Sequence, residues 1–287
     1  MKTTLTTDKT FAQEINKHYA QTDLSVTILT ALQRGGKDVN ALTREDIATF
    51  DEFHIRGRAA TIEIGQLADL QPGAELLDLG CGIGGAARTL MVEFGCRVTG
   101  IDLVEEYIQT ARILNTRIGY DGRITFEQGN VLDMPFDDDL FDVVFSQHTM
   151  MNIEDKTRLA QEVRRVLRPG GRFVLYEICA GSVSTPYFPV PWAGDPAINF
   201  LVEPQTLHQM VDETGFKALE WRDVTASSLD WAQQLIANIG NRPADGPPPL
   251  GLNLLMGATT AEKARNMMRN LEEDRIRVIQ AVVVLTD

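Results

Sequence analysis

The sequence has few cysteines, no long apolar run and no excess of basic residues. Its three cysteines, Cys81, Cys96 and Cys179, are too few and too far apart for a disulfide framework or a zinc site. The longest apolar stretch, 278–285, is far shorter than the ~20 residues that cross a bilayer. The balance of 27 Lys and Arg against 40 Asp and Glu gives a net charge of −13, which argues against nucleic acid or an anionic membrane as partner. We therefore expect a cytoplasmic protein with no nucleic-acid or membrane partner.

The composition is that of an ordinary globular protein. The chain has 287 residues, of which 44% are hydrophobic and 23% charged. A chain of this length buries roughly 75% of its unfolded surface, so its core needs no metal or disulfide. Histidines and carboxylates do not cluster at ligand spacing, and no metal is expected.

The chain divides into three stretches with different patterns. Residues 1–72 have the spaced apolar residues of helices and end at a Pro-Gly pair. In residues 73–180, five short apolar strands alternate with amphipathic helices, which indicates βαβ units and a parallel sheet. Residues 181–287 are irregular at first and then return to helix and strand. This pattern predicts an α/β doubly wound sheet of seven strands, six parallel and the last antiparallel, with a helical N-terminal cap (1–72), a core (73–180) and a lid insertion plus C-terminal half of the same domain (181–287).

The segment 184–202 begins this irregular part. It carries four prolines and four aromatic residues, so it is expected to be a stiff loop. It is either a lid over a substrate or a hydrophobic plug on the sheet. Two later strands, 217–224 and 277–285, are expected to pair antiparallel with each other. The last helix and strand offer an edge for a homodimer, and the oligomeric state stays open.

A glycine-rich loop at 78–85, Asp-Leu-Gly-Cys-Gly-Ile-Gly-Gly, joins the first strand to the following helix. Closely spaced glycines let the backbone turn sharply and approach a ligand at the helix N-terminus. Asp102 ends the second strand, where an acid faces the same crevice and suits the two hydroxyls of a ribose. Gly80, Gly82 and Gly85 also satisfy GxGxxG, the fingerprint of a dinucleotide site.

Asp78 extends the loop to the pattern D-x-G-x-G-x-G, and here the sequence resembles the class I S-adenosylmethionine-dependent methyltransferases. The resemblance continues over four further segments: 100–106, 129–136, 141–148 and 165–177. It is closest to the small-molecule branch of methyltransferase type 11, which includes quinone-biosynthesis C-methyltransferases, phosphoethanolamine methyltransferases and sarcosine/dimethylglycine N-methyltransferases.

The resemblance implies methyl transfer from S-adenosylmethionine to a small molecule, with S-adenosylhomocysteine as product. It leaves open whether nitrogen, oxygen, sulfur or carbon is methylated. Two other functions remain: an NAD-dependent oxidoreductase, and a non-catalytic S-adenosylmethionine-binding regulatory protein.

Cofactor contacts follow from the resemblance residue by residue. Gly80, Gly82 and Gly84 would pack against the methionine part of the cofactor. Asp78 would hold the loop and the amino group, and Asp102 would accept both ribose hydroxyls.

The adenine and the amino group have further expected contacts. Leu103 would pack on the adenine ring, while Asn130 and Val131 would recognise its edge. The family usually has Asp at position 130, and Asn keeps a carbonyl acceptor but loses the charge. The backbone around Gln147 would meet the amino group.

The expected catalytic residues are His148 and Tyr19. His148 follows the fourth strand, and its ordinary pKa suits a general base near neutrality; otherwise it shapes the pocket or caps a helix. Tyr19 lies on an N-terminal helix that folds over the active site in related enzymes, or it is a packing aromatic. A base is needed only where the nucleophile must lose a proton.

Five residues are candidates for substrate binding. Arg58 could clamp a carboxylate bidentately, or form a surface salt bridge. Tyr176 ends the fifth strand, a frequent substrate-facing position in the family. The others are His54 on the third helix and, in the proline-rich segment, Tyr187 and Trp192.

Overall fold

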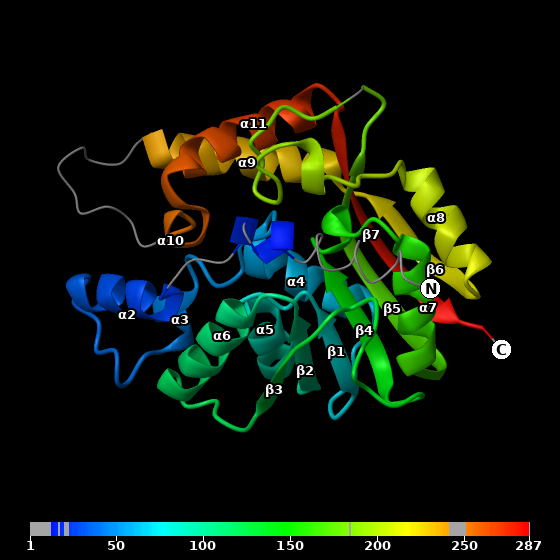
Figure 1. Cartoon of the computed structure of the whole chain (residues 1–287), viewed down its shortest axis with the longest axis horizontal. Coiled ribbons are helices and arrows are strands. Elements are labelled where there is room, and N and C mark those ends of the chain that lie inside the picture. Colours follow the sequence, from blue (N-terminus) through cyan, green and yellow to red (C-terminus); the bar gives the residue numbers. More distant parts are fainter. Residues whose placement is uncertain (1–12, 17, 20–22, 184, 241–250, 287) are drawn as a thin grey trace.

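One twisted sheet with helices on both faces forms the body of the protein (Figure 1). The computed structural model describes residues 13–16, 18–19, 23–183, 185–240 and 251–286. The seven strands have the order β3-β2-β1-β4-β5-β7-β6, and β7 runs antiparallel to both of its neighbours. This confirms the predicted doubly wound sheet. The strands are β1 (Glu75–Leu79), β2 (Arg97–Asp102), β3 (Ile124–Gln128), β4 (Phe141–Gln147), β5 (Leu167–Ala180), β6 (Phe216–Asp223) and β7 (Ile276–Leu285).

The position of β7 corrects one expectation. β7 lies between β5 and β6, so the C-terminal strand has no free edge for a partner. The expected pairing of the two late strands is confirmed, because β6 pairs antiparallel with β7.

Helices alternate with the strands over much of the chain. Thr43 and Asp46 form a capping box, in which the Thr43 hydroxyl accepts from the Asp46 N–H and the Asp46 carboxylate accepts from the Thr43 N–H. The helices are α2 (Leu24–Arg34), α3 (Arg44–Ile47), α4 (Gly57–Leu67), α5 (Gly85–Phe94), α6 (Glu105–Arg117), α7 (Lys156–Val166), α8 (Pro204–Glu213), α9 (Thr225–Gly240), α10 (Asn253–Met256) and α11 (Thr260–Glu272).

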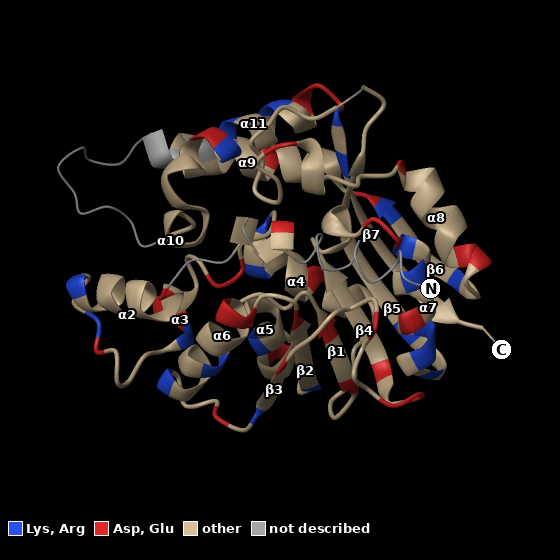
Figure 2. Cartoon of the chain, viewed as in Figure 1, with Lys and Arg blue, Asp and Glu red and all other residues tan. Residues whose placement is uncertain are grey.

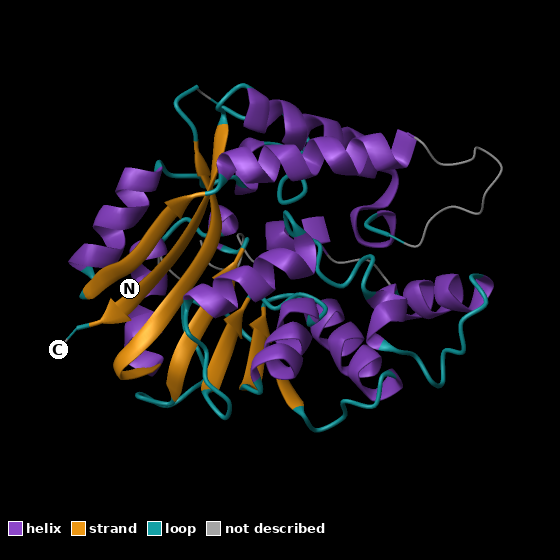
Figure 3. Cartoon of the chain, turned by 180° about the vertical axis from the view of Figure 1, so that it is seen from behind, coloured by secondary structure: helices purple, strands orange, loops and turns teal. Residues whose placement is uncertain are grey.

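Both faces of the sheet are covered. Side chains alternate across a strand, so Leu76 joins one apolar cluster and Leu77 the other. The first cluster holds buried residues of α2, α4, α5 and α6, and the second those of α7 and α8. Figure 3 shows these two helical layers from behind. Burial on both faces explains why the central strands are almost wholly apolar.

Helices α9 and α11 pack against each other and against β7, above the end of the sheet where the glycine loop lies (Figures 1 and 3). Figure 2 shows charges of both signs interspersed over the surface helices. Among the described residues, no helix is both long and apolar enough to cross a bilayer. The space between this helical roof and the strand ends contains the candidate site.

Candidate functional site

Two adjoining pockets lie where β1, β2 and β4 end. The smaller one follows the ends of β1 and β2, and its lining includes six of the nine residues expected to contact a cofactor. Parallel strands end at one edge of a sheet, which is why residues far apart in sequence meet there. The lining residues are Ile15, Tyr19, Phe53, Gly80, Gly82, Asp102, Leu103, Val104, Tyr107, Asn130, Val131, His148, Thr149, Asn152 and Ile153.

The glycine loop contributes two glycines to this pocket. Gly80 and Gly82 have φ values of 63° and 54°, in the left-handed region that favours glycine. Gly84 differs from the expectation, because it lines neither of the two pockets. A Cβ at Gly84 would lie 2.5 Å from the Phe126 ring, so this glycine allows the loop to pack against β3.

Asp102 is held by the backbone on both sides of the pocket. Its Oδ2 accepts the Gly82 N–H at 2.9 Å, and its Oδ1 accepts the Val104 N–H at 2.9 Å. The side chain lines the smaller pocket although the residue is 9% exposed. Burial raises the pKa of Asp102, while the backbone hydrogen bonds oppose this rise. One carboxylate therefore fixes the glycine loop and still has lone pairs to offer a ligand.

Asn130 lines the pocket, but its side chain is committed locally. Its Oδ1 accepts the Leu132 N–H at 3.0 Å, which is the geometry of an Asx turn. Asn130 Oδ1 can therefore accept a hydrogen bond from a ligand, as expected, only through its second lone pair. Leu103 and Val131 supply apolar lining beside it.

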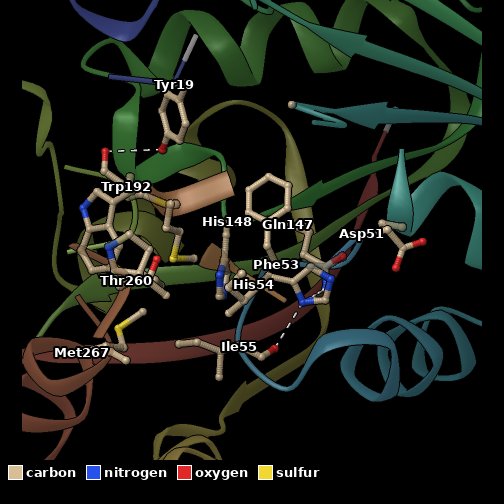
Figure 4. A pocket seen from close by; sticks show the side chains of 18 of the residues that line it. Tyr19, Asp51, Phe53, His54, Ile55, Gln147, His148, Trp192, Thr260 and Met267 are labelled. Atoms are coloured by element: carbon tan, nitrogen blue, oxygen red, sulfur yellow. Dashed lines mark hydrogen bonds between the residues drawn. The ribbon is translucent and has the colours of Figure 1, made fainter. Parts of the chain in front are cut away.

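The larger pocket extends from the glycine loop to the helical roof, with about 1120 Å³ of empty space including its open mouth. Figure 4 shows Tyr19 and Trp192 on one side and His54 and Gln147 on the other, with His148 between them. The lining residues are Tyr19, Asp51, Phe53, His54, Ile55, Asp78, Gly80, Cys81, Ala86, Gln147, His148, Met151, Ile178, Pro191, Trp192, Trp231, Ala232, Leu235, Leu252, Met256, Thr260, Ala264 and Met267.

His148 lies at the junction and lines both pockets. Its φ of 51° is left-handed, and its N–H donates to the Tyr176 carbonyl at 2.8 Å. The imidazole stacks on the Tyr176 ring, with 4.9 Å between centroids. Burial, assisted by His54, lowers the pKa of His148 well below 6.5, and its Nε2 has no hydrogen-bond partner among the described residues. The ring is therefore neutral near pH 7 and keeps an unpartnered lone pair on Nε2, while burial makes it a weaker base than an exposed histidine.

Glu177, which like Tyr176 was expected at a substrate-facing position near the end of the fifth strand, instead holds the turn that carries His148. Its carboxylate accepts the N–H groups of Thr149 and Met150 at 3.1 Å each and the Ser146 hydroxyl at 2.5 Å. Burial raises the pKa of Glu177 to about 7. This role has no local signal in the sequence, because the partners of Glu177 lie in a neighbouring strand.

Tyr19 closes the junction from the N-terminal segment. Its hydroxyl donates to Asn152 Oδ1 at 2.7 Å, and Asn152 Nδ2 donates to the carbonyls of Trp192 and Ile198 at 2.9 and 2.8 Å. Burial raises the pKa of Tyr19 well above 10, so the phenol stays protonated. Asn152 was not predicted, although it ties Tyr19 to the proline-rich segment.

The proline-rich segment packs against the core and also borders the larger pocket. Trp192 is 1% exposed and belongs with Val190 to the main apolar cluster, as a plug would. Trp192 also lines the larger pocket, as a lid residue would. Its indole N–H donates to Asn199 Oδ1 at 2.8 Å, which fixes the ring.

Two carboxyls, Asp51 and Asp78, lie at the loop end of the larger pocket. One oxygen of each is buried without a hydrogen-bond partner among the described residues. Burial, followed by repulsion from Asp102 and Glu52, raises the pKa of Asp78 to about 8. Asp51 lies 3.4 Å from Arg88, a fully buried guanidinium. An unsatisfied buried carboxyl is costly, so this end of the pocket is prepared for a donor or a cation.

His54 and Gln147 form the polar wall opposite the roof. His54 Nδ1 lies 3.2 Å from Gln147 Nε2, and His54 Nε2 lies 3.3 Å from Glu52 Oε2. The Thr61 hydroxyl donates to Glu52 at 2.6 Å, and its oxygen lies 3.2 Å from Gln147 Oε1. Gln147 therefore lines the pocket as expected, but its side chain serves this network.

Three expected substrate contacts lie outside both pockets. Arg58 pairs with Glu45 at 2.9 Å and with Glu52 at 3.5 Å. Tyr176 is fully buried beneath His148. Tyr187 is held between two guanidiniums, those of Arg269 and Arg275, 3.6 and 4.2 Å from its ring centre. Their side-chain chemistry can be read from the sequence, whereas their neighbours depend on the tertiary structure.

Comparison with known proteins identifies the domain. Residues 77–175 match the family model described as methyltransferase domain. The glycine/sarcosine/dimethylglycine N-methyltransferase of Actinopolyspora halophila is 37% identical over 48% of this chain, which covers 24% of that protein. O-methyltransferase resE of Aspergillus sclerotiorum is 28% identical over 63% of this chain and 69% of that protein. The chain thus spans about a quarter of the first relative and about two thirds of the second.

A solved structure shares the fold. Phosphoethanolamine N-methyltransferase 2 of Haemonchus contortus, in complex with S-adenosyl-L-methionine, superposes with a TM-score of 0.71 and 20% identity. The match covers 85% of this chain and 58% of that one. The chain therefore carries a methyltransferase domain at residues 77–175, and most of the chain shares the fold of that solved methyltransferase structure.

Proposed function

We propose that this protein transfers the methyl group of S-adenosylmethionine to a small-molecule acceptor. The adenosine of the cofactor occupies the smaller pocket, with its ribose on Asp102 and its adenine between Leu103 and Val131. Its methionine end reaches Gly80 and Asp78. The acceptor occupies the rest of the larger pocket.

One observation carries this proposal: the two pockets share Tyr19, Phe53, Gly80 and His148. Methyl transfer is an in-line displacement, so donor and acceptor must meet end to end. Holding them in line supplies a large effective concentration of the nucleophile. The junction at His148 is the place where the methyl group would pass.

The reaction needs little from the protein besides position and a proton acceptor. A bond forms between the nucleophile and the methyl carbon, and the carbon–sulfur bond breaks with its electron pair left on sulfur. The sulfonium thereby becomes the neutral thioether of S-adenosylhomocysteine. An acceptor that carries a proton would pass it to His148, which is neutral and has an unpartnered nitrogen. Tyr19 stays protonated and orients the junction through Asn152.

Calorimetry with two cofactors tests the proposal. S-adenosylmethionine and NADH are titrated separately into the protein, and release of S-adenosylhomocysteine is then scored with a panel of amines, thiols, phenols, quinols and carboxylic acids. We expect binding of S-adenosylmethionine alone and turnover with one acceptor class. Binding of NADH instead would support the oxidoreductase. Binding of S-adenosylmethionine without turnover across the panel would favour a regulatory protein.

Asp78 makes cofactor binding depend on pH. With a pKa of about 8, about 0.9 of the Asp78 carboxyls are protonated at pH 7 in the empty protein. A bound ammonium favours the carboxylate, so binding should release a proton, and affinity should rise between pH 6 and 8. The measurement is calorimetry at pH 7 in buffers of different ionisation enthalpy, together with Kd at each pH.

Asp78→Asn is the matched control for this prediction. The amide keeps the shape of the side chain and cannot titrate, so affinity should be lower and independent of pH over the same range. Equal proton release by the variant and the wild type would show that another group is responsible.

The remaining expectations belong to the same proposal. Three buried free cysteines support a cytoplasmic location, because reduced thiols are usual there. The boundaries 1–72, 73–180 and 181–287 correspond to a cap, a cofactor-binding core and a C-terminal half that supplies β6, β7 and the roof.

A further inference from the structure

The roof of the larger pocket turns apolar faces inward. From α9 the lining residues are Trp231, Ala232 and Leu235, and from α11 they are Thr260, Ala264 and Met267. These spacings of one, three and four residues place each set on one side of its helix. The charged residues of α11 that are exposed, such as Glu262 and Arg265, lie elsewhere on the helix. A helix face that is apolar toward a cavity is suited to an apolar ligand.

The walls beneath the roof continue this character. Met151 follows β4, Ile178 lies in β5, and Pro191 and Trp192 come from the proline-rich segment. Figure 4 shows Trp192, Thr260 and Met267 grouped on one side of His148, away from Asp51 and Gln147. The pocket therefore has a polar end near the cofactor loop and an apolar body under the roof.

The charge of the lining is one-sided. Among the residues that the structure describes, those that line this pocket include two carboxyls, Asp51 and Asp78, and neither Lys nor Arg. The basic groups nearby are engaged: Arg88 donates to the Ile83 carbonyl at 2.9 Å, and Lys263 to the Met256 carbonyl at 3.5 Å. A buried carboxylate or phosphate would find no cation there, and an unpaired buried charge is costly.

We propose, building on the methyltransferase function above, that the larger pocket takes an uncharged, largely hydrophobic acceptor. Its apolar body lies under α9 and α11, and its reacting group lies at His148. A carboxylate or phosphate on the body of the acceptor would meet neither Lys nor Arg among the described residues that line the pocket. Acceptors with an ammonium on the body would lose hydration without gaining an anion, because both carboxyls lie at the cofactor end.

Three phenols of similar size separate these classes. They are 4-propylphenol, which is neutral, 3-(4-hydroxyphenyl)propionate, which is an anion, and tyramine, which is a cation. The protein has three tryptophans, and Trp192 and Trp231 line the pocket. Trp221 packs against His208 away from it, so Trp221→Phe leaves two reporters in the site. Fluorescence of this variant, saturated with S-adenosylhomocysteine, gives the Kd of each phenol.

We expect 4-propylphenol to bind at least about tenfold more tightly than either charged phenol, a difference of about 1.4 kcal/mol. Ala264→Lys, which adds a cation to the roof, should reverse the order for the propionate. Tighter binding of the propionate or tyramine by the parent, or binding of none of the three, would overturn the inference. Calorimetry of S-adenosylmethionine binding to the same variant measures the cofactor pocket separately. If the cofactor binds and the phenols do not behave as expected, the inference about the acceptor fails while the proposed function stands.

Discussion

Replacement of Asp102 by alanine should weaken S-adenosylmethionine binding by at least about 100-fold. Two hydrogen bonds to a charged acceptor contribute about 1.5–3 kcal/mol each, and 1.4 kcal/mol is a factor of ten. The variant also frees the N–H groups of Gly82 and Val104, which the carboxylate now accepts at 2.9 Å. The glycine loop thus loses its anchor together with the ribose acceptor. Isothermal calorimetry measures the loss directly.

Two further variants test whether the loss of S-adenosylmethionine affinity arises from the carboxylate in the pocket. Asp102→Asn keeps one carbonyl oxygen, so its affinity should lie between those of the wild type and Asp102→Ala. Glu105→Ala removes an exposed carboxylate three residues later that bonds Gln109 and lines neither pocket. Its affinity should equal that of the wild type. Wild-type affinity in Asp102→Ala, with an unchanged unfolding temperature, would place the ribose elsewhere.

The cofactor side of the site was predictable because its signals are local. Asp78, the glycine loop and Asp102 lie within 25 residues of one another, at the ends of two adjacent strands. Strand alternation and turn chemistry are enough to place such residues at one edge of a parallel sheet. The structure brings Gly80, Gly82 and Asp102 to one pocket for this reason.

The acceptor side was less predictable because it is assembled from distant segments. Tyr19 and Trp192 are 173 positions apart in the sequence. The Trp192 carbonyl contacts the Tyr19 hydroxyl directly and also accepts a hydrogen bond from Asn152. The apolar faces of α9 and α11 were visible as periodicity, but periodicity does not tell a face that packs from a face that lines a cavity. The roof could therefore be predicted as helices and not as a binding surface.

Two substrate-contact candidates, Arg58 and Tyr187, lie outside both pockets for the same reason. Both side chains suit a ligand, yet nearby residues of the chain already contact them. Arg58 is engaged by Glu45 and Glu52, and Tyr187 by Arg269 and Arg275. Side-chain pairing across elements depends on tertiary geometry, so a single sequence does not reveal which polar group is free.

His148→Asn should lower kcat by about 10²–10⁴ with any acceptor that must lose a proton. Asparagine tolerates the left-handed φ of 51°, so the turn should keep its form, whereas alanine would be strained there. A base acts in its deprotonated form. Because burial lowers the pKa of His148 well below 6.5, the wild-type rate should stay level down to about pH 6.5 and fall only at lower pH. The pH profile of kcat, measured with a phenol or amine acceptor, tests both statements.

The same profile separates a base from a residue that only shapes the pocket. If His148 is the base, its protonation causes the fall of kcat at low pH, and His148→Asn should abolish that fall. The Kd for S-adenosylmethionine should stay within about threefold of the wild type. A shaping residue would instead raise KM for the acceptor and leave the pH dependence intact. The pH dependence of stability gives an independent check on the burial of His148. In the unfolded chain this histidine binds a proton near pH 6.5, whereas in the folded protein burial prevents it from doing so. The free energy of unfolding should therefore fall as the pH drops below this value. Removing the imidazole should make the unfolding temperature less sensitive to acid, and an unaltered sensitivity would mean that His148 titrates normally in the folded protein.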